Sequence, residues 1–402
     1  MTHTHPHPGS ALGLALPLLL ALALPAQNAA SRPATSRTSA WSEAQQRGFA
    51  YLVTQQKDGV FEVKTKQGSR PDLGLSALAL AALQSKPRGE RSADEAATIA
   101  KGLAWLASQQ EKDGSIGTQL SNYNTCTSML ALAKSGDPRY ADALAKAQRF
   151  IVALQHAEQR GFAPSDPDYG SIGYGREGRG DLSNLAFAVE ALRASGLSEK
   201  DEALVRATAF LQRTQNLRAT NDVQRTTKDE TSGATLTIVS GDDGGAAYYP
   251  GSSPMGYAEL GDGKSVPRSY GSMTYALLKT YLLAGVPAGD ARVRAAVAWI
   301  TKNWTLEENP GADPKLPEKT KFEGLYYQYL MMAKALDLAG IETLRVERGG
   351  APVDVAWRST LRKQLLGLQK PDGSWVNDKN DRWWEGMPVI VTAYALLALE
   401  HT

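Results

Sequence analysis

The sequence predicts an all-α protein, an α/α toroid (an α6/α6 barrel) built from six helix-pair repeats. The first observation behind this prediction is a unit made of an amphipathic helix, a glutamine or asparagine and a turn, which recurs along residues 41–402. The second is that the next helix of each unit is apolar nearly all round, as expected for a helix buried on every face. The third is the irregular spacing of the units, whereas open solenoids keep a tight period. Outer helices that alternate with buried inner ones predict a closed ring.

Each outer helix ends on a bulky residue, an aliphatic residue and then an amide residue. The six copies are Tyr51-Leu52 with Gln55, Trp105-Leu106 with Gln109, Phe150-Ile151 with Gln155, Phe210-Leu211 with Gln215, Trp299-Ile300 with Asn303, and Leu365-Leu366 with Gln369. Asp-Gly pairs follow at 57–61, 112–116 and 371–375. They predict a turn there, because Gly readily adopts the left-handed backbone that ends a helix. We interpret Asp242-Asp243 as another such turn, with Tyr248-Tyr249 in its aromatic position.

The inner helices are expected to begin near six positions, which are Leu73, Cys126, Leu182, Gly271, Leu325 and Val391. We treat residues 41–402 as one domain. Its longest insertion, residues 216–267, is polar and Gly-rich and contains a β-prone run at 235–240. A loop of that length is usually functional or disordered, so we expect a lid or rim element near the ring. The Gly-rich segment 173–180 follows no strand and is expected to be a loop over one rim.

The N-terminus has the pattern of a secretory signal peptide over residues 1–30, followed by a polar linker at 31–40. Residues 11–24 are apolar or small, and alanines follow them, although the preceding segment has His rather than Lys or Arg. We therefore expect a secreted or periplasmic protein. No run of 18 apolar residues occurs, so we expect no membrane span.

The composition excludes several classes of function. Lys and Arg number 44 against 42 Asp and Glu, a net charge of +2, so we expect no nucleic-acid partner. A single cysteine excludes an intramolecular disulfide and a cysteine-based zinc cluster. Cys126 is expected to be buried and structural. We predict no bound metal and find no cofactor motif.

The Gln, Asp-Gly and aromatic order resembles the QW repeat of squalene–hopene cyclases. Its best copy is Gln369 with Gly373 and Trp375, and two eroded copies begin at Gln55 and Gln109. The chain resembles the terpenoid cyclase / protein prenyltransferase superfamily, and in particular its secreted bacterial prenyltransferase/squalene-oxidase-repeat proteins. The resemblance implies that the glutamine amide stacks on the aromatic ring and ties the outer helix to the turn.

The motifs that carry the chemistry of this superfamily are missing. The sequence has no DxDD, in which an aspartic acid protonates an alkene. It also lacks the Asp, Cys and His zinc ligands of protein prenyltransferases and the GCGEQ-type thioester sequence. The sequence therefore does not decide whether this protein is an enzyme.

Polar and aromatic residues gather at the starts of the inner helices, which share one end of the predicted ring. Three of them are weak catalytic candidates, namely Asp181, Glu323 and Glu385. The predicted ligand-binding residues are Asn124, Asn184, Tyr270, Tyr326, Tyr327, Trp383 and Trp384. Acids at helix starts also serve as caps for free N–H groups, and the aromatic residues also suit packing. Together, acids and aromatic rings around one mouth are typical of a ligand site.

Three functional interpretations stay open. The first is a central cavity that binds, and could transform, a hydrophobic isoprenoid-like ligand, a small molecule or lipid. The second is a polysaccharide lyase or hydrolase of the (α/α) toroid type, which needs two carboxyl groups about 5–9.5 Å apart. The third is a non-catalytic scaffold for a protein partner that the sequence does not identify. The fold alone cannot choose among them.

Overall fold

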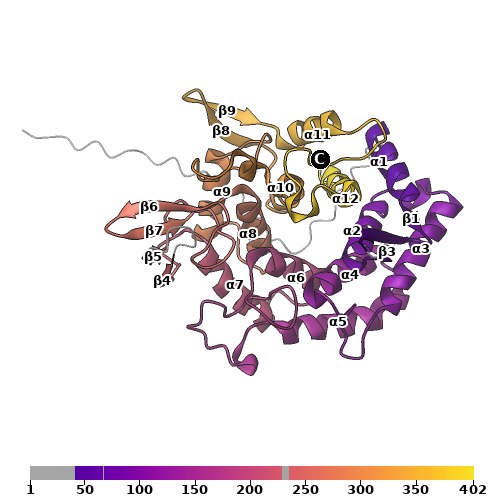
Figure 1. Cartoon of the computed structure of the whole chain (residues 1–402), viewed down its shortest axis with the longest axis horizontal. Helices are drawn as coiled ribbons and strands as arrows, with labels where there is room; N and C mark the ends of the chain where they lie inside the picture. Colours follow the sequence, from indigo (N-terminus) through magenta and orange to yellow (C-terminus); the bar gives the residue numbers. More distant parts are fainter. Residues whose placement is uncertain (1–40, 67, 229–234) are drawn as a thin grey trace, which may run out of the picture.

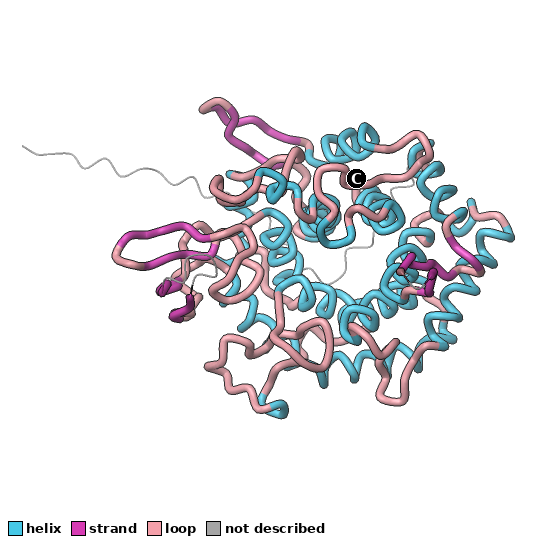
Figure 2. Tube along the Cα trace, in the orientation of Figure 1, coloured by secondary structure: helices cyan, strands magenta, loops and turns pink. Residues whose placement is uncertain are grey.

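A computed structural model describes residues 41–66, 68–228 and 235–402 of the chain. In this part of the chain, twelve α-helices form two concentric rings (Figures 1 and 2). The inner ring comprises α2 (Leu73–Leu83), α4 (Ser121–Ser135), α6 (Leu182–Ala194), α8 (Gly271–Leu283), α10 (Leu325–Leu338) and α12 (Pro388–Leu399). The outer ring comprises α1 (Glu43–Thr54), α3 (Ala93–Ser108), α5 (Ala141–Leu154), α7 (Glu202–Thr214), α9 (Ala291–Lys302) and α11 (Trp357–Leu368). The predicted α/α toroid is confirmed.

The inner helices close on themselves. Each packs against the next, from α2 through α4, α6, α8 and α10 to α12, and α12 returns to α2. Every residue of α12 from Ile390 to Leu399 is buried, as the all-round apolar sequence predicts. The outer helix α5 instead buries one stripe, Ala147, Phe150, Ile151 and Leu154, whose spacing of three and four residues follows the helical period.

Glutamine side chains join neighbouring repeats at the ends of outer helices. In each case Nε2 donates to the glycine carbonyl of the following turn and to a carbonyl of the next outer helix, at 2.8–3.1 Å. The bonds run from Gln110 to Gly114 and Ala143, from Gln155 to Gly170 and Ala203, from Gln215 to Gly244 and Arg292, and from Gln369 to Gly373 and Ala44. The last of these links α11 to α1 and so closes the outer ring.

Two glutamines of the predicted repeat are one position out of register. The side chains of Gln55 and Gln109 only reach the hydroxyls of Thr54 and Ser108, the residues before them. Gln110 makes the bonds between repeats, and Gln56 accepts from the turn N–H of Gly59 at 2.5 Å. Both positions are Gln-Gln doublets, and the helix ends just before the doublet in each case. The sequence pattern alone did not reveal which glutamine of each doublet makes these contacts.

The turns after α11 and α7 also dock on inner helices. The N–H of Trp375 donates to the Thr392 hydroxyl of α12 at 3.0 Å. The N–H of Ala246 makes the equivalent bond to Thr274 of α8 at 3.1 Å. Asp242-Asp243 is therefore a repeat turn as predicted, but its aromatic position is occupied by Ala246. Placing Tyr248-Tyr249 there was wrong, because the turn is two residues shorter than the sequence suggested.

Three small sheets depart from the all-α prediction within the described residues. They are β1 (Gln56–Lys57), β2 (Val60–Thr65) and β3 (Gly68–Pro71); β4 (Gln224–Lys228), β5 (Thr235–Val239), β7 (Lys264–Pro267) and β6 (Tyr257–Gly261); and β8 (Leu344–Arg348) with β9 (Ala351–Val355). The sequence indicated only β5. The hairpins β6–β7 and β8–β9 project from the rings (Figure 1), whereas β2 packs against α2.

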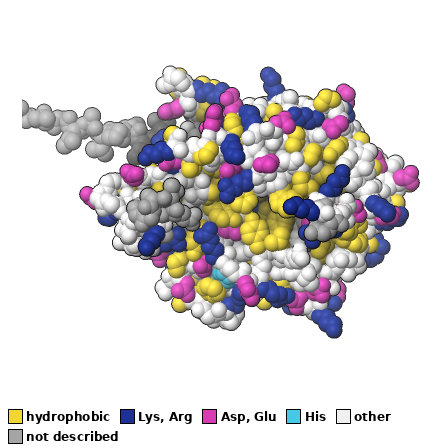
Figure 3. All heavy atoms as spheres, viewed as in Figure 1, with side chains coloured by type: hydrophobic (Ala, Val, Ile, Leu, Met, Phe, Trp, Pro, Cys, Tyr) yellow, Lys and Arg dark blue, Asp and Glu magenta, His cyan; other side chains and the backbone are white. Residues whose placement is uncertain are grey.

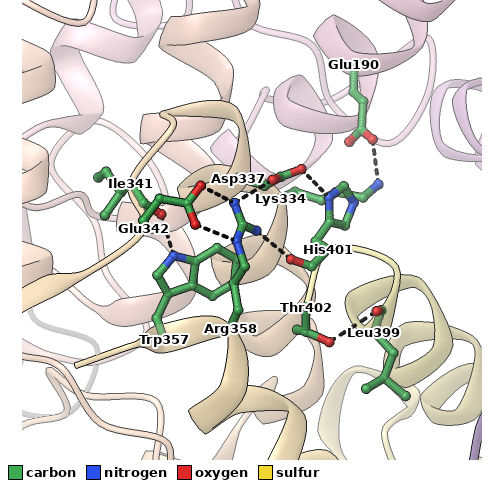
Figure 4. A network of polar contacts seen from close by, with 10 residues as sticks. All are labelled: Glu190, Lys334, Asp337, Ile341, Glu342, Trp357, Arg358, Leu399, His401 and Thr402. Atoms are coloured by element: carbon green, nitrogen blue, oxygen red, sulfur yellow. Dashed lines mark hydrogen bonds and ion pairs between the residues drawn. The ribbon is translucent and has the colours of Figure 1, made fainter. Parts of the chain in front are cut away.

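Ion pairs anchor the C-terminus against α10 and α11 (Figure 4). Arg358 lies 2.8 Å from Asp337 and 3.3 Å from Glu342, and it donates to the carbonyl of His401 at 2.6 Å. The His401 ring lies 2.8 Å from the same Asp337 carboxylate. The end of the chain is thereby held at the end of the ring where the inner helices finish.

Candidate functional site

A cavity of about 460 Å³ opens where the inner helices begin. Its size falls within the range of small-molecule sites. Figure 3 shows hydrophobic side chains around a hollow near the middle of this face of the molecule. Every inner helix contributes to the wall from its first turns, with Leu75 of α2, Tyr123 of α4, Asn184 of α6, Met273 of α8, Tyr327 of α10 and Ile390 of α12.

Most of the predicted site residues line this cavity. They are Asn124, Asn184, Tyr270, Glu323, Tyr327, Trp383, Trp384 and Glu385. Two do not reach it. Tyr326 is buried behind the wall with its ring edge-on to Tyr329, the centroids 5.5 Å apart, because successive side chains on a helix point about 100° apart. Asp181 lies behind Ser183 and Asn184, which do line the cavity.

Asp181 is the N-cap of α6. Its Oδ1 accepts from the Asn184 N–H at 2.9 Å and from the Ser183 hydroxyl at 2.7 Å, and its Oδ2 accepts from the Asn184 side-chain amide at 2.7 Å. Burial raises the pKa of this carboxyl. The alternative role of a buried cap therefore holds for Asp181, and its effect on the cavity is to fix the orientation of Asn184.

Glu385 is fully buried, and although it lies shortly before α12, its side chain caps α10. Its Oε1 accepts from the Tyr327 N–H in the first turn of α10 at 2.8 Å, and its Oε2 accepts from the Asn377 amide at 2.7 Å. α10 needs such a partner because its N-cap residue is Gly324, which has no side chain. Burial raises the pKa of Glu385 to about 7, against these hydrogen bonds. Sequence spacing could not reveal this cap, since its two ends lie 58 residues apart.

Glu323 lies just before α10 and caps nothing in the described chain. The Arg382 Nη1 lies 3.2 Å from both of its carboxylate oxygens but donates a hydrogen bond only to Oε1. Oε2 is buried without a hydrogen-bond partner among the described residues. Glu323 is 7% exposed, whereas the Arg382 side chain is half exposed and its guanidinium lies 4.8 Å from the Trp383 ring centroid. Of the three candidate acids, Glu323 is the one with an oxygen that accepts no hydrogen bond from the described chain.

A chain of aromatic contacts crosses the cavity wall. The Phe187 ring of α6 lies 5.5 Å from Tyr123 and 6.1 Å from Tyr327, and Tyr327 lies 6.1 Å from Tyr394 of α12. Such edge-on and tilted pairs stabilise a wall that is apolar on the face of each ring. Sequence reasoning missed Phe187 and Tyr394, which lie one to two turns inside their helices. Phe187 lies three residues after Asn184, and Tyr394 lies four residues after Ile390. Residues at these spacings share one face of a helix, which was the available signal.

Charged side chains lie beyond the Phe187 ring, toward the far end of the ring. Glu190 of α6 contacts Lys279 of α8 and Lys334 of α10, each at 2.5 Å, and the Lys334 contact is drawn in Figure 4. The ammonium of Lys279 is buried and lies 5.9 Å from the Phe187 centroid. Burial alone would raise the pKa of Glu190, but the two lysines lower it. This ion triad ties three inner helices together beyond the cavity.

Three bulky residues form an apolar rim at the mouth. Leu120, Trp383 and Trp384 line the cavity and are 54%, 45% and 59% exposed. All three have left-handed backbones, with φ of 43°, 61° and 68°. For a residue with a side chain this conformation costs roughly 1–2 kcal/mol. Strain of this kind gathers at functional sites, so the rim is where we expect a ligand to enter.

The expected loops lie at the same mouth. Tyr174 from the Gly-rich segment and Tyr248, Pro254 and Met255 from the long insertion line the cavity. The insertion therefore forms part of the wall, while its four-stranded sheet lies outside the rings. Residues 229–234 lie outside the described part of the chain.

The described residues show neither a metal-binding cluster nor a membrane-spanning helix. Among residues 41–66, 68–228 and 235–402, no group of three or more His, Cys, Asp or Glu side chains is arranged to hold a metal ion. Within the same residues, no helix is long and apolar enough to cross a membrane. Cys126 is buried, as expected, and hydrogen-bonds Asn122 at 3.1 Å.

The sequence of residues 74–232 matches the family profile of the squalene-hopene cyclase C-terminal domain. This segment covers α2 to α7 and the start of the long insertion. Residues 74–232 are thus similar to this cyclase domain. The resemblance expected from the glutamine and Asp-Gly pattern is thus confirmed, and no curated protein sequence matches the chain.

Solved structures are similar to this chain over most of its length. An unsaturated glucuronyl hydrolase specific for heparin is 14% identical, with a TM-score of 0.51 over 89% of this chain and 95% of its own. The type II terpene cyclase MstE from Scytonema is 16% identical, with a TM-score of 0.46 over 89% and 96%. A protein from Actinoplanes is 14% identical, with a TM-score of 0.47 over 89% and 98%. At these identities the likeness concerns the fold.

Proposed function

We propose that this protein is exported and binds a hydrophobic, isoprenoid-like ligand in its central cavity. The observation that carries the proposal is the wall itself, in which Leu75, Phe187, Met273, Ile390 and Tyr394 present apolar surface inside a ring of six helices. Apolar surface removed from water contributes about 25 cal/mol per Å², so an apolar ligand is stabilised at this position. The match to the squalene-hopene cyclase domain supports the same class of ligand.

The arrangement of acids favours binding of a lipid over hydrolysis of a sugar. A glycoside hydrolase needs two carboxyl groups facing one substrate. Asp181 lies behind the wall as a helix cap, and both oxygens of Glu385 accept hydrogen bonds from the protein. Glu323 alone keeps a carboxylate oxygen without a hydrogen-bond partner in the described chain. This arrangement supports the lipid proposal over the polysaccharide alternative.

Export rests on the N-terminal sequence, and residues 1–30 lie outside the described part of the chain. We propose that they are a cleaved signal peptide. Expression of the full chain with its own N-terminus, followed by intact mass measurement of the extracellular or periplasmic fraction, tests this. Loss of about the first 30 residues supports export. A full-length chain confined to the cytoplasm contradicts it.

A variant that fills the cavity tests ligand binding. Met387→Trp places a larger side chain in the wall, whereas Leu366→Trp makes a matched change on the outer helix α11, at a residue 37% exposed. Binding of farnesol, followed by tryptophan fluorescence, is expected to weaken at least about tenfold in the first variant and to stay unchanged in the second. Equal binding by both variants and the parent chain, with melting temperatures also equal, places the ligand elsewhere and contradicts the proposal.

A further inference from the structure

Polar groups are distributed unevenly around the cavity. The side formed by α12, α2 and β2 presents Val63, Leu75, Met387 and Ile390. The side between α6 and α10 presents buried polar side chains, each at most 7% exposed, which are Asn184, Ser272, Asn309 and Glu323. Polar residues near α2 and α4, such as Arg70 and Gln119, are instead exposed at the rim. The side formed by α12, α2 and β2 is therefore mainly apolar apart from Asp72, and the side between α6 and α10 holds the deep polar groups.

Two buried polar atoms on the deep polar side have no hydrogen-bond partner in the described chain, and one of them, Glu323 Oε2, has only the ion-pair contact with Arg382 Nη1 at 3.2 Å. The other is the Tyr327 hydroxyl. Most buried polar atoms in native proteins have a hydrogen-bond partner, and one without a partner destabilises the fold. The two residues belong to the same stretch, at the start of α10, and both line the cavity. A ligand in the cavity would supply the missing partners.

The two groups together select a particular chemistry. A carboxylate only accepts hydrogen bonds, whereas a phenol also donates one. A hydroxyl is a small group that can donate a hydrogen bond to the Glu323 carboxylate and accept one from the Tyr327 phenol. On the basis of the proposed function, we propose that the ligand is an amphiphile with a terminal hydroxyl, bound by Glu323 and Tyr327, and an apolar body that lies against α2 and α12.

The charges on the polar side disfavour an anionic end group. Glu323 itself is acidic, and its neighbouring guanidinium, Arg382, is already paired with it. Burial raises the pKa of the Tyr270 hydroxyl, and the nearby Tyr327, Asp181 and Glu323 raise it further. That effect is typical of a wall in which negative charge outweighs positive charge. A diphosphate or carboxylate placed there would be repelled, and the exposed Arg70 lies across the mouth on β3.

Three probes with one hydrocarbon tail test the end group. Geranylgeraniol donates and accepts, geranylgeranyl acetate only accepts, and geranylgeranyl diphosphate is anionic. We expect the alcohol to bind the purified protein about tenfold more tightly than either of the others, measured by calorimetry. Equal affinity for alcohol and acetate, or tightest binding of the diphosphate, overturns the inference while the proposed function stands. Failure of all three to bind overturns both.

Matched variants assign the effect to the two side chains. Glu323→Leu and Tyr327→Phe are expected to bring the affinity for the alcohol down to that for the acetate, and to leave acetate binding unchanged. The controls are Glu318→Leu, whose side chain is 83% exposed, and Tyr326→Phe, which does not line the cavity. Arg382 stays solvated in Glu323→Leu because its side chain is 52% exposed. Retention of the alcohol preference in both cavity variants contradicts the assignment.

Discussion

The side-chain amide of Gln369 donates a 2.8 Å hydrogen bond to the carbonyl of Ala44, and this bond joins the last outer helix to the first. The same amide donates to the Gly373 carbonyl at 2.9 Å. Gln110, Gln155 and Gln215 make equivalent pairs of bonds between earlier repeats. Closure of the ring thus repeats the contact that links α3 to α5, α5 to α7 and α7 to α9.

Gln369→Leu is expected to destabilise the ring. It leaves two partly buried carbonyls without their donor, which costs about 1–3 kcal/mol of the free energy of unfolding. Gln109→Leu serves as the control, because that amide reaches only the Ser108 hydroxyl, and a change within about 0.5 kcal/mol is expected. Urea unfolding measures both. Equal stability of the two variants contradicts this role of the glutamine.

Gly373→Ala is expected to destabilise the protein by more than about 2 kcal/mol. The glycine has φ of 89°, and an added Cβ would lie 2.5 Å from the Arg47 carbonyl of α1. Gly367→Ala in the helix α11 is the matched control, since nothing lies within 4 Å of its added Cβ. Removing a glycine from a helix interior stabilises it by roughly 0.5–1 kcal/mol. Thermal melting is expected to shift in opposite directions for the two variants.

Glu385 is expected to make stability depend on pH. Its pKa is raised from 4.5 to about 7 in the folded chain, so the unfolded chain loses this proton first as the pH rises. Stability from this group is therefore full below about pH 4.5, falls between about pH 4.5 and 7, and is constant above. The loss amounts to about 3 kcal/mol. Urea unfolding at pH 5 and pH 8 should show a smaller loss in Glu385→Gln than in the parent chain. An identical pH dependence in both would show that Glu385 titrates normally.

The strained rim is expected to serve the ligand and not the fold. Trp384→Gly relieves a φ of 68° at a residue 59% exposed, so stability should hold or rise. Farnesol binding should weaken, because the variant loses aromatic surface at the mouth. Asp262→Gly relieves a similar φ of 51° in the turn between β6 and β7, and it should leave binding unchanged. Loss of stability in Trp384→Gly without loss of binding would assign the tryptophan to packing.

Helix periodicity was enough to predict the rings, and it placed the starts of α2, α6, α8 and α10 at their observed residues. Helix periodicity could not decide which of two adjacent glutamines contacts the repeat turn, as in the Gln55-Gln56 doublet. The outer hairpins were also missed, apart from β5. Their short strands pair mainly with one another, and such local pairings leave little periodic signal.

The site was predictable only in part. Residues at the helix starts, such as Asn184 and Tyr327, could be placed at the mouth because parallel inner helices share one end. The sequence could not show that Glu385 caps α10 or that Arg382 pairs with Glu323, since both contacts cross tens of residues. It also could not distinguish Tyr326 from Tyr327, because the facing side of a helix depends on how the ring packs.

The most direct test of the proposed cavity ligand is native mass spectrometry of the protein, purified without detergent, beside its Met387→Trp variant. We predict a parent protein that carries a bound lipid of defined mass and a folded variant that does not. A parent protein of bare polypeptide mass, which also stays bare after incubation with geranylgeraniol and farnesol, would contradict the proposal that this cavity binds a hydrophobic ligand.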